Sequence, residues 1–164
     1  MSSFKLSRLR LADLRDALGS LPPNDIGDLK SIRKLNKALD CIEEVNKDYI
    51  NSLDALRKEA FDSIKDERAE LTELQKAGQG LEGKAKKDNE DKHKKLENVA
   101  NAKLSTYNEK LLAYQMENGK EVVEVEMDGN YQTELKEQFK KHGAKLFLQQ
   151  KPYLEVAEGL GIEE

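Results

Sequence analysis

Acidic side chains are the most numerous groups in this chain that could move a proton. Glu43, Glu44 and Asp48 stand close together in a charged segment, where two carboxylates would be the simplest acid and base pair. Glu43 is followed by Lys47 four residues later, which is the spacing of an ordinary ion pair on a helix surface. We interpret these carboxylates as a solvated helix face and predict no catalytic role for them.

Histidine and cysteine, the residues best suited to metal binding or nucleophilic attack, are few and scattered. The chain has two histidines, His93 and His142, and one cysteine, Cys41. Zinc needs further ligands at helical or short-loop spacing, and no recognisable set surrounds either histidine. Cys41 stands beside apolar Ile42 without an identifiable base, which is typical of a small buried residue. The sequence therefore predicts no metal, no cofactor and no enzymatic activity.

Two further patterns resemble phosphate-binding features. Gly78, Gly80 and Gly83 do not follow a hydrophobic strand and lack the glycine-lysine-serine/threonine ending of a phosphate loop, so they predict a turn. A lysine cluster follows these glycines, and its members are Lys84, Lys86, Lys87, Lys92, Lys94 and Lys95. Acidic residues interrupt the cluster and no aromatic residue is interleaved for base stacking, so nucleic-acid binding is disfavoured.

The composition favours helices that bury only a narrow stripe. The chain has 164 residues, of which 37% are hydrophobic and 37% are charged, and its net charge is -4. Positive and negative residues are mixed along the chain, which gives no sustained attraction to a polyanion. No apolar stretch has the length of a signal peptide or a transmembrane helix, so we expect no membrane association and a location in the cytoplasm or in a virion assembled there.

The strongest pattern is a ladder of residues at alternating steps of three and four. It predicts a long helix with one seam that packs on another helix, either in the same chain or in a second copy. The residues of this interaction seam are Ile32, Leu35, Leu39, Ile42, Asn46, Tyr49, Leu53 and Leu56.

Asn46 is the polar member of the seam and allows two interpretations. A buried asparagine at such a position can specify the register and the number of paired helices, at a cost in stability. Alternatively, the helix rotates slightly so that Val45 and Ile50 face the partner and Asn46 lies at the edge, because an ideal helix drifts against a seven-residue repeat.

The seam lies in the middle of three predicted segments. Residues 1–23 predict a short helix over Phe4–Leu21, with Ser7 as its cap and with Gly19 and the Pro22-Pro23 pair at its end. Residues 24–118 predict a long antiparallel helical hairpin, coiled-coil-like, whose tip lies near 78–83. Its first helix runs without a break to about residue 74, and Gly119 ends the second in the left-handed conformation.

Residues 119–164 predict a small α+β base, so that the whole chain is mainly α. Residues 123–127 alternate as a half-buried strand, which a turn at 128–130 closes, and 133–142 suit a short helix that ends at Gly143. Residues 146–148 and 154–156 read as extended segments. Phe139, Phe147 and Tyr153 are the predicted packing residues of this base.

The order of these parts resembles that of small uncharacterised proteins encoded in the structural gene modules of tailed bacteriophages. The similarity lies in the leucine-rich opening, the Lys/Glu-rich helix of the type Ile32–Leu39, the turn Asp128–Tyr131 and the acidic, apolar tail with Tyr153–Val156. It covers the two ends better than the middle, where this chain has a much longer hairpin. The resemblance implies a virion or assembly role and carries over no catalytic residue.

We therefore predict a non-enzymatic structural or interaction protein that acts through helix packing. Its expected partners are proteins, either further copies of this chain or other virion proteins. Two alternatives remain open at this point. One is a small acidic helical inhibitor or adaptor that binds a host protein, and the other is a nucleic-acid-binding accessory protein that uses the lysine cluster.

Overall fold

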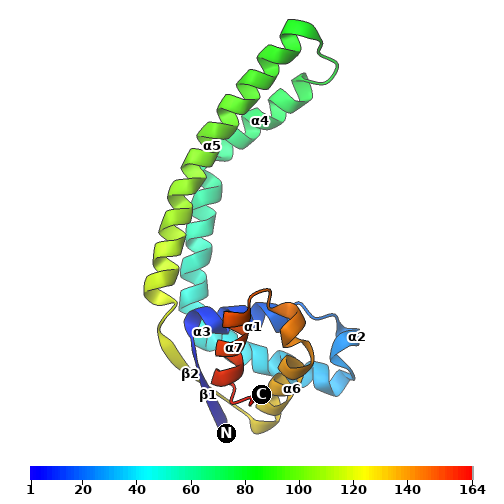
Figure 1. The fold of residues 1–164 in the computed structure, drawn as a ribbon, viewed down its shortest axis with the longest axis vertical. Coiled ribbons are helices and arrows are strands. Elements are labelled where there is room, and N and C mark those ends of the chain that lie inside the picture. Colours follow the sequence, from blue (N-terminus) through cyan, green and yellow to red (C-terminus); the bar gives the residue numbers. More distant parts are fainter. Residues whose placement is uncertain (164) are drawn as a thin grey trace. The chain divides into compact units, whose positions relative to one another are not determined.

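The computed structural model describes residues 1–163 and confirms a mainly α fold (Figure 1). The described residues form two strands and seven helices. In chain order these are β1 (Ser2–Ser7), α1 (Arg8–Gly19), α2 (Pro23–Ile26), α3 (Leu29–Ser63), α4 (Lys65–Ala77), α5 (Gly83–Asn118), β2 (Val122–Met127), α6 (Gly129–Leu146) and α7 (Gln150–Gly159). None of the helices within residues 1–163 combines the length and the hydropathy needed to cross a bilayer.

The chain divides into two compact units. One, the terminal unit, combines Met1–Asn51 with the residues from Gln115 onward, and the other, the hairpin unit, is Ser52–Tyr114. Helices α3 and α5 each contribute residues to both units. The sequence interpretation placed the two ends of the chain in separate segments, whereas here the first and last parts of the chain share one core.

Pairing between β1 and β2 is what joins the two ends. The strands run antiparallel, with Phe4 opposite Val125 and Leu6 opposite Val123. The strand predicted at 123–127 is confirmed, but the helix predicted from Phe4 is wrong over its first turn, because it begins only at Arg8. Phe4 and Leu6 are buried and Lys5 is exposed, which is the period of two that a half-buried strand requires.

The first backbone N–H groups of α1 have no partner within the helix. They donate hydrogen bonds to the cap residue and to the connection between α5 and β2. The Ser7 hydroxyl accepts a hydrogen bond from the Arg10 backbone N–H (3.3 Å), which confirms Ser7 as the cap. The Leu9 N–H donates to the carbonyl oxygen of Gly119 (3.0 Å). Gly119 follows the end of α5 as predicted, but the left-handed conformation expected for it is wrong. Space is the constraint instead, because a Cβ there would overlap the carbonyl oxygen of Gln115 and would lie 3.1 Å from the Cβ of Leu9.

Helices α6 and α7 correct three expectations at the C-terminal end. The Asp128 carboxylate accepts a hydrogen bond from the Asn130 N–H (2.8 Å), so the predicted turn caps α6. The predicted helix over 133–142 is confirmed but does not stop at Gly143, which lies inside α6 against the ring of Phe139. Residues 154–156, expected to be extended, belong to α7, and Leu146 still belongs to α6, whereas Phe147 has the extended backbone expected for it.

The core of the terminal unit is assembled from all of its elements. It contains Phe4 and Leu6 of β1, Val125 and Met127 of β2, Ile26 of α2, Leu11, Leu14 and Leu18 of α1, Leu35, Ala38, Leu39 and Ile42 of α3, Leu135 and Phe139 of α6, and Val156, Ala157 and Leu160 at the end of the chain.

In the hairpin unit, α5 lies beside the end of α3 and beside α4 (Figure 1). The predicted unbroken helix from 24 to 74 is wrong at two places. Gly27, at φ 128°, separates α2 from α3, and Ile64 separates α3 from α4. At the second break Lys103 of α5 donates to the carbonyl oxygen of Ser63 (3.4 Å) and forms an ion pair with Glu67. A side chain bound at a break accounts for the interruption of a helix that lacks proline and glycine there.

Candidate interaction surfaces

Most of the predicted interaction seam is buried inside this chain. Leu35, Leu39, Ile42, Asn46, Tyr49 and Leu53 are buried, while Ile32 and Leu56 are half-buried. Leu35, Leu39 and Ile42 lie in the core of the terminal unit, among residues of both ends of the chain. These positions of the seam therefore pack within the chain, and surfaces available to a partner must be sought elsewhere.

Asn46 follows neither of the two interpretations of the seam. Its Nδ2 donates to the backbone carbonyl oxygen of Arg8 (2.9 Å), and Arg8 Nη1 donates in return to the carbonyl oxygen of Val45 (3.1 Å). Asn46 thus joins α3 to the junction of β1 and α1. Its buried amide is hydrogen-bonded to backbone rather than to a matching asparagine on a paired helix.

The three predicted packing residues of the base lie together. The Phe139 ring is stacked on the Tyr153 ring at 5.2 Å between centroids, and Phe147 meets Phe139 edge-on at 5.8 Å. Such pairs add a modest specific attraction to the burial of apolar area. Phe139 is fully buried, whereas Phe147 and Tyr153 are half-buried and pack against the core. The structure therefore gives these residues a packing role in the terminal unit.

Two ion pairs hold the start of α1 to the C-terminal part of the chain. Arg8 Nε donates to Glu121 at 2.6 Å, and Arg10 Nε donates to Glu155 at 2.5 Å. The hydrogen bond from each arginine lowers the pKa of its carboxylate below the ordinary value of 4.5. The two ion pairs thus contribute stability that is present above pH 4.5 and is lost as the pH falls through the lower folded-state pKa values.

This linkage predicts an acid-sensitive contribution that can be removed by mutation. The double variant Glu121→Gln with Glu155→Gln should melt below the wild type at neutral pH, and the two melting temperatures should converge below pH 4.5. Glu126→Gln is the matched control, because Glu126 is exposed on β2 and forms no ion pair within the described residues. Thermal unfolding followed by circular dichroism across this pH range makes the measurement. If the difference in melting temperature between the wild type and the double variant stayed constant with pH, the two ion pairs would not be the source of the lost stability.

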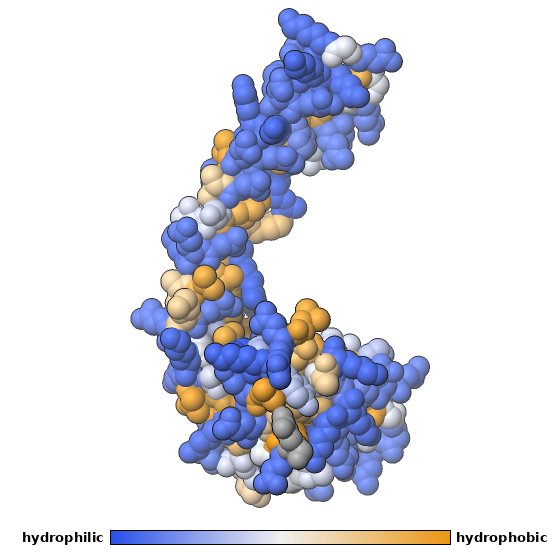
Figure 2. Space-filling view, viewed as in Figure 1, coloured by the Kyte–Doolittle hydropathy of each residue, from blue (hydrophilic) through white to orange (hydrophobic). Residues whose placement is uncertain are grey.

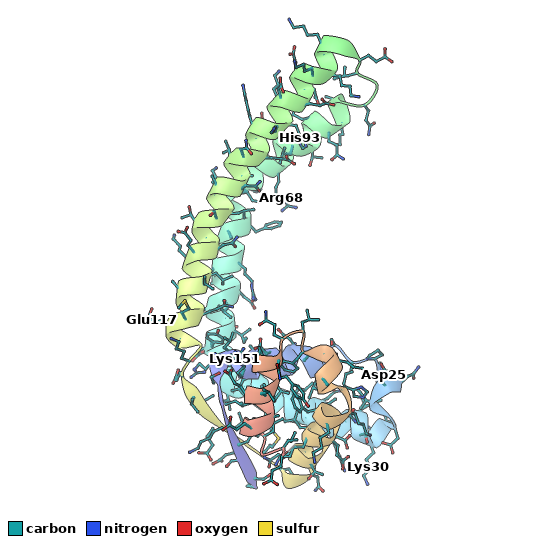
Figure 3. All side chains as sticks on the ribbon, viewed as in Figure 1. Asp25, Lys30, Arg68, His93, Glu117 and Lys151 are labelled. Carbon is teal, nitrogen blue, oxygen red and sulfur yellow. The ribbon has the colours of Figure 1, made fainter. Side chains whose placement is uncertain are left out.

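The histidines and the cysteine lie apart from one another. Nε2 of His142 lies 3.1 Å from the carbonyl oxygen of Asp25, and it must carry the proton because a carbonyl only accepts. His93 on α5 lies 3.6 Å from Glu97 (Figure 3). Cys41 is half-buried against the core of the terminal unit. Over residues 1–163, no three His, Cys, Asp or Glu side chains are grouped so that they could hold a metal ion.

An apolar groove opens on the hairpin unit close to the break between α3 and α4. It has a volume of about 270 Å³ and is lined by Leu56, Arg57, Ala60, Phe61, Ile64, Leu104, Tyr107, Asn108 and Leu111. Phe61 is 55% exposed at this groove. Arg68 on α4 places its guanidinium 3.9 Å from the centre of the Phe61 ring (Figure 3). We call this feature the Phe61 groove.

The surface of the hairpin unit changes character along its length. Apolar side chains reach the surface in its middle part, whereas the end that carries the α4–α5 connection is almost wholly hydrophilic (Figure 2). The lysine cluster lies at this hydrophilic end, and all of its lysines are exposed. The predicted turn is present there, with Gly80 and Gly83 at positive φ.

The Phe61 groove was not singled out from the sequence. Leu56 is a seam residue, and Leu104 and Leu111 belong to an apolar stripe on the return helix, but Phe61 follows Leu56 by five residues and so lies off the three- and four-residue steps of the seam. A large aromatic residue off the seam is the signal that was available.

Comparison of the chain with protein-family models, with curated proteins and with solved structures gives no match.

Proposed function

We propose that this chain is a non-enzymatic interaction protein that joins a larger protein assembly, namely the particle of a tailed bacteriophage. It would be made in the host cytoplasm and incorporated into the virion, with protein partners rather than nucleic acid or membrane. The observation that carries the proposal is the Phe61 groove, an apolar hollow left open on the surface of the hairpin unit, with a large aromatic residue exposed in it.

The groove fits one apolar side chain of a partner protein with a carboxylate beside it. Its walls are aliphatic and aromatic, and its exposed Phe61 would lose most of its contact with water on binding. Burying a large apolar side chain contributes about 1.5 to 3 kcal/mol. Arg68 covers the Phe61 ring and supplies a cation for an acidic neighbour of the inserted side chain, whereas Arg57, which also lines the groove, is paired with Asp54 at 3.1 Å.

The proposal predicts that an acidic residue in the groove prevents incorporation. Phe61→Asp should reduce the amount of this chain in gradient-purified particles by about tenfold or more, because the apolar contact is lost and the new carboxylate lies beside Arg68, the cation that the partner's acidic group would use. Leu112→Asp is the matched control, since Leu112 belongs to the same unit, is 58% exposed and does not line the groove. Quantitative immunoblotting of particle fractions makes the measurement, with circular dichroism to show that both variants fold.

Three results would be informative. Wild type and Leu112→Asp in particles, with Phe61→Asp absent, would support both the role and the groove. Equal incorporation of all three would exclude the groove as the contact. A wild-type chain found only in the free protein fraction of the lysate would overturn the assembly role and favour an inhibitor or adaptor that acts on a host protein.

A further inference from the structure

The outer face of α3 in the terminal unit carries charges that are segregated by sign. Its exposed positions are spaced by alternating steps of three and four, so they follow one another along a single stripe of the helix. The first half of the stripe is basic, with Lys30, Arg33 and Lys37. The second half begins with Asp40 and Glu44.

Two further charges flank this stripe, one on each side of it. Lys34 lies next to Arg33 and is half-buried, and Glu43 lies next to Glu44 and is exposed. Lys37 and Asp40, which flank the change of sign, are 3.9 Å apart. The stripe lies opposite the seam positions, which face the core of the terminal unit.

Several of these charges have no ionic partner among the described residues. Glu43 is paired with Arg15 of α1 at 2.9 Å. Over residues 1–163, by contrast, no ion pair is formed by Arg33, Lys34 or Glu44. Charged groups left exposed on one helix face are available to a partner of complementary charge.

An open groove runs along the basic half of the stripe. It has a volume of about 830 Å³ and is lined by Leu29, Lys30, Arg33, Lys34, Asn36, Lys37, Asp40 and Tyr131. Leu29 is 61% exposed there, and Lys30 lies at the start of α3 (Figure 3). Leu29, Tyr131 and the aliphatic stems of the lysines supply apolar contact beside the charges.

We propose that this face of α3 binds the same face of a second copy of the chain, with the two helices antiparallel. A two-fold axis between Ala38 and Leu39 places Arg33 of each copy opposite Glu44 of the other. The same axis places Lys37 opposite Asp40. Each of these two contacts occurs twice in the dimer, because a two-fold interface uses the same patch on both copies.

A second copy of the chain complements this face better than a partner that carries only acidic groups. Both the basic half and the acidic half of the complementary pattern are present on one helix, at distances from the axis that match pair by pair. A parallel arrangement in register would instead place like charges opposite each other, which is unfavourable. One antiparallel pair has like signs, because Lys30 meets Lys47 at each end of the interface.

The expected dimer is weak and sensitive to salt. Exposed ion pairs contribute about 0 to 1 kcal/mol each, so the paired charges give specificity and the apolar contact beside them gives part of the affinity. Screening shortens the reach of such charges from about 10 Å at 0.1 M salt to about 3 Å at 1 M. The dissociation constant should therefore rise by about tenfold or more over this range.

The test is sedimentation equilibrium of the purified full chain with charge-reversed variants. Arg33→Glu and Glu44→Arg should each be monomeric at concentrations where the wild type is dimeric. The double variant that carries both changes should again be dimeric, because the opposite charges are exchanged across the same contact. An equimolar mixture of the two single variants should form a mixed dimer, since both of its Arg33–Glu44 contacts are then complementary.

Lys47→Glu provides an independent check in the opposite direction. It should tighten the dimer, because it converts the like-signed Lys30–Lys47 contact into an attractive one. A wild type that remains monomeric at low salt would overturn the proposal. So would a dimer that persists in the single variants, or folded single variants whose mixture and double variant both stay monomeric. The measurement involves no particle, so its failure would leave the proposed assembly role untouched.

Discussion

Replacing Phe139 by alanine should lower the free energy of unfolding by about 3 to 5 kcal/mol. Phe139 has 0% of its surface exposed and belongs to the core of the terminal unit. Its ring is stacked on Tyr153 and meets Phe147 edge-on, so truncation removes both aromatic contacts and leaves a cavity. A loss of this size is a large part of the stability of an ordinary domain.

Leu148→Ala is the matched control for this substitution. Leu148 follows Phe147 and is 98% exposed, so its truncation should change the free energy of unfolding by less than about 0.5 kcal/mol. Urea unfolding followed by circular dichroism compares both variants with the wild type. Equal effects of the two variants would show that the three aromatic rings are not packed as described.

Replacing Gly159 by alanine should also be strongly destabilising, because α7 approaches β1 through this residue. A Cβ on Gly159 would lie 2.8 Å from the Lys5 carbonyl oxygen and 2.8 Å from Leu6 Cγ, and it would meet Leu6 Cδ2 still more closely. The carbonyl belongs to the backbone of β1 and cannot turn away as a side chain can. We expect a loss of about 3 kcal/mol, the upper end for overpacking in a core.

Gly129→Ala separates this steric effect from the general effect of alanine. Gly129 is the first residue of α6, and the nearest atom to its added Cβ would be Ser2 Oγ at 3.8 Å. Alanine favours a helix over glycine by up to about 1 kcal/mol, so this variant should be neutral or slightly stabilised. Melting temperatures of both variants make the comparison. If Gly159→Ala had the same melting temperature as the wild type, the close approach of α7 to β1 would be excluded.

Features that depend on neighbours in the chain were readable from the residues alone. The ladder from Ile32 predicted a helix, the alternation at 123–127 predicted a strand, and Ser7 predicted a cap. Each rests on side chains a few residues apart, whose spacing is set by the geometry of a helix turn or a strand pleat. The glycines from Gly78 to Gly83 predicted a turn for the same local reason.

The partners of these elements were decided only in the tertiary structure. The strand character of Phe4 and Leu6 depends on β2, which is more than 100 residues away in the chain. Leu35, Leu39 and Ile42 offered an apolar stripe that another helix could equally have covered, and it is the meeting of the two chain ends that buries it. Local spacing specifies which face is apolar, but not which surface covers it.

The candidate surfaces divide in the same way. The sequence by itself determined the charged stripe of α3, because residues three and four apart must share one helix face. Phe61 and the leucines that surround it come from α3 and α5, and only their packing creates the Phe61 groove. Asn46 lay in the predicted seam, yet its role follows from the carbonyl group of Arg8, which the fold brings within hydrogen-bond distance. Spacing along one helix is a local property, whereas a groove or a hydrogen bond between distant segments exists only after the chain has packed.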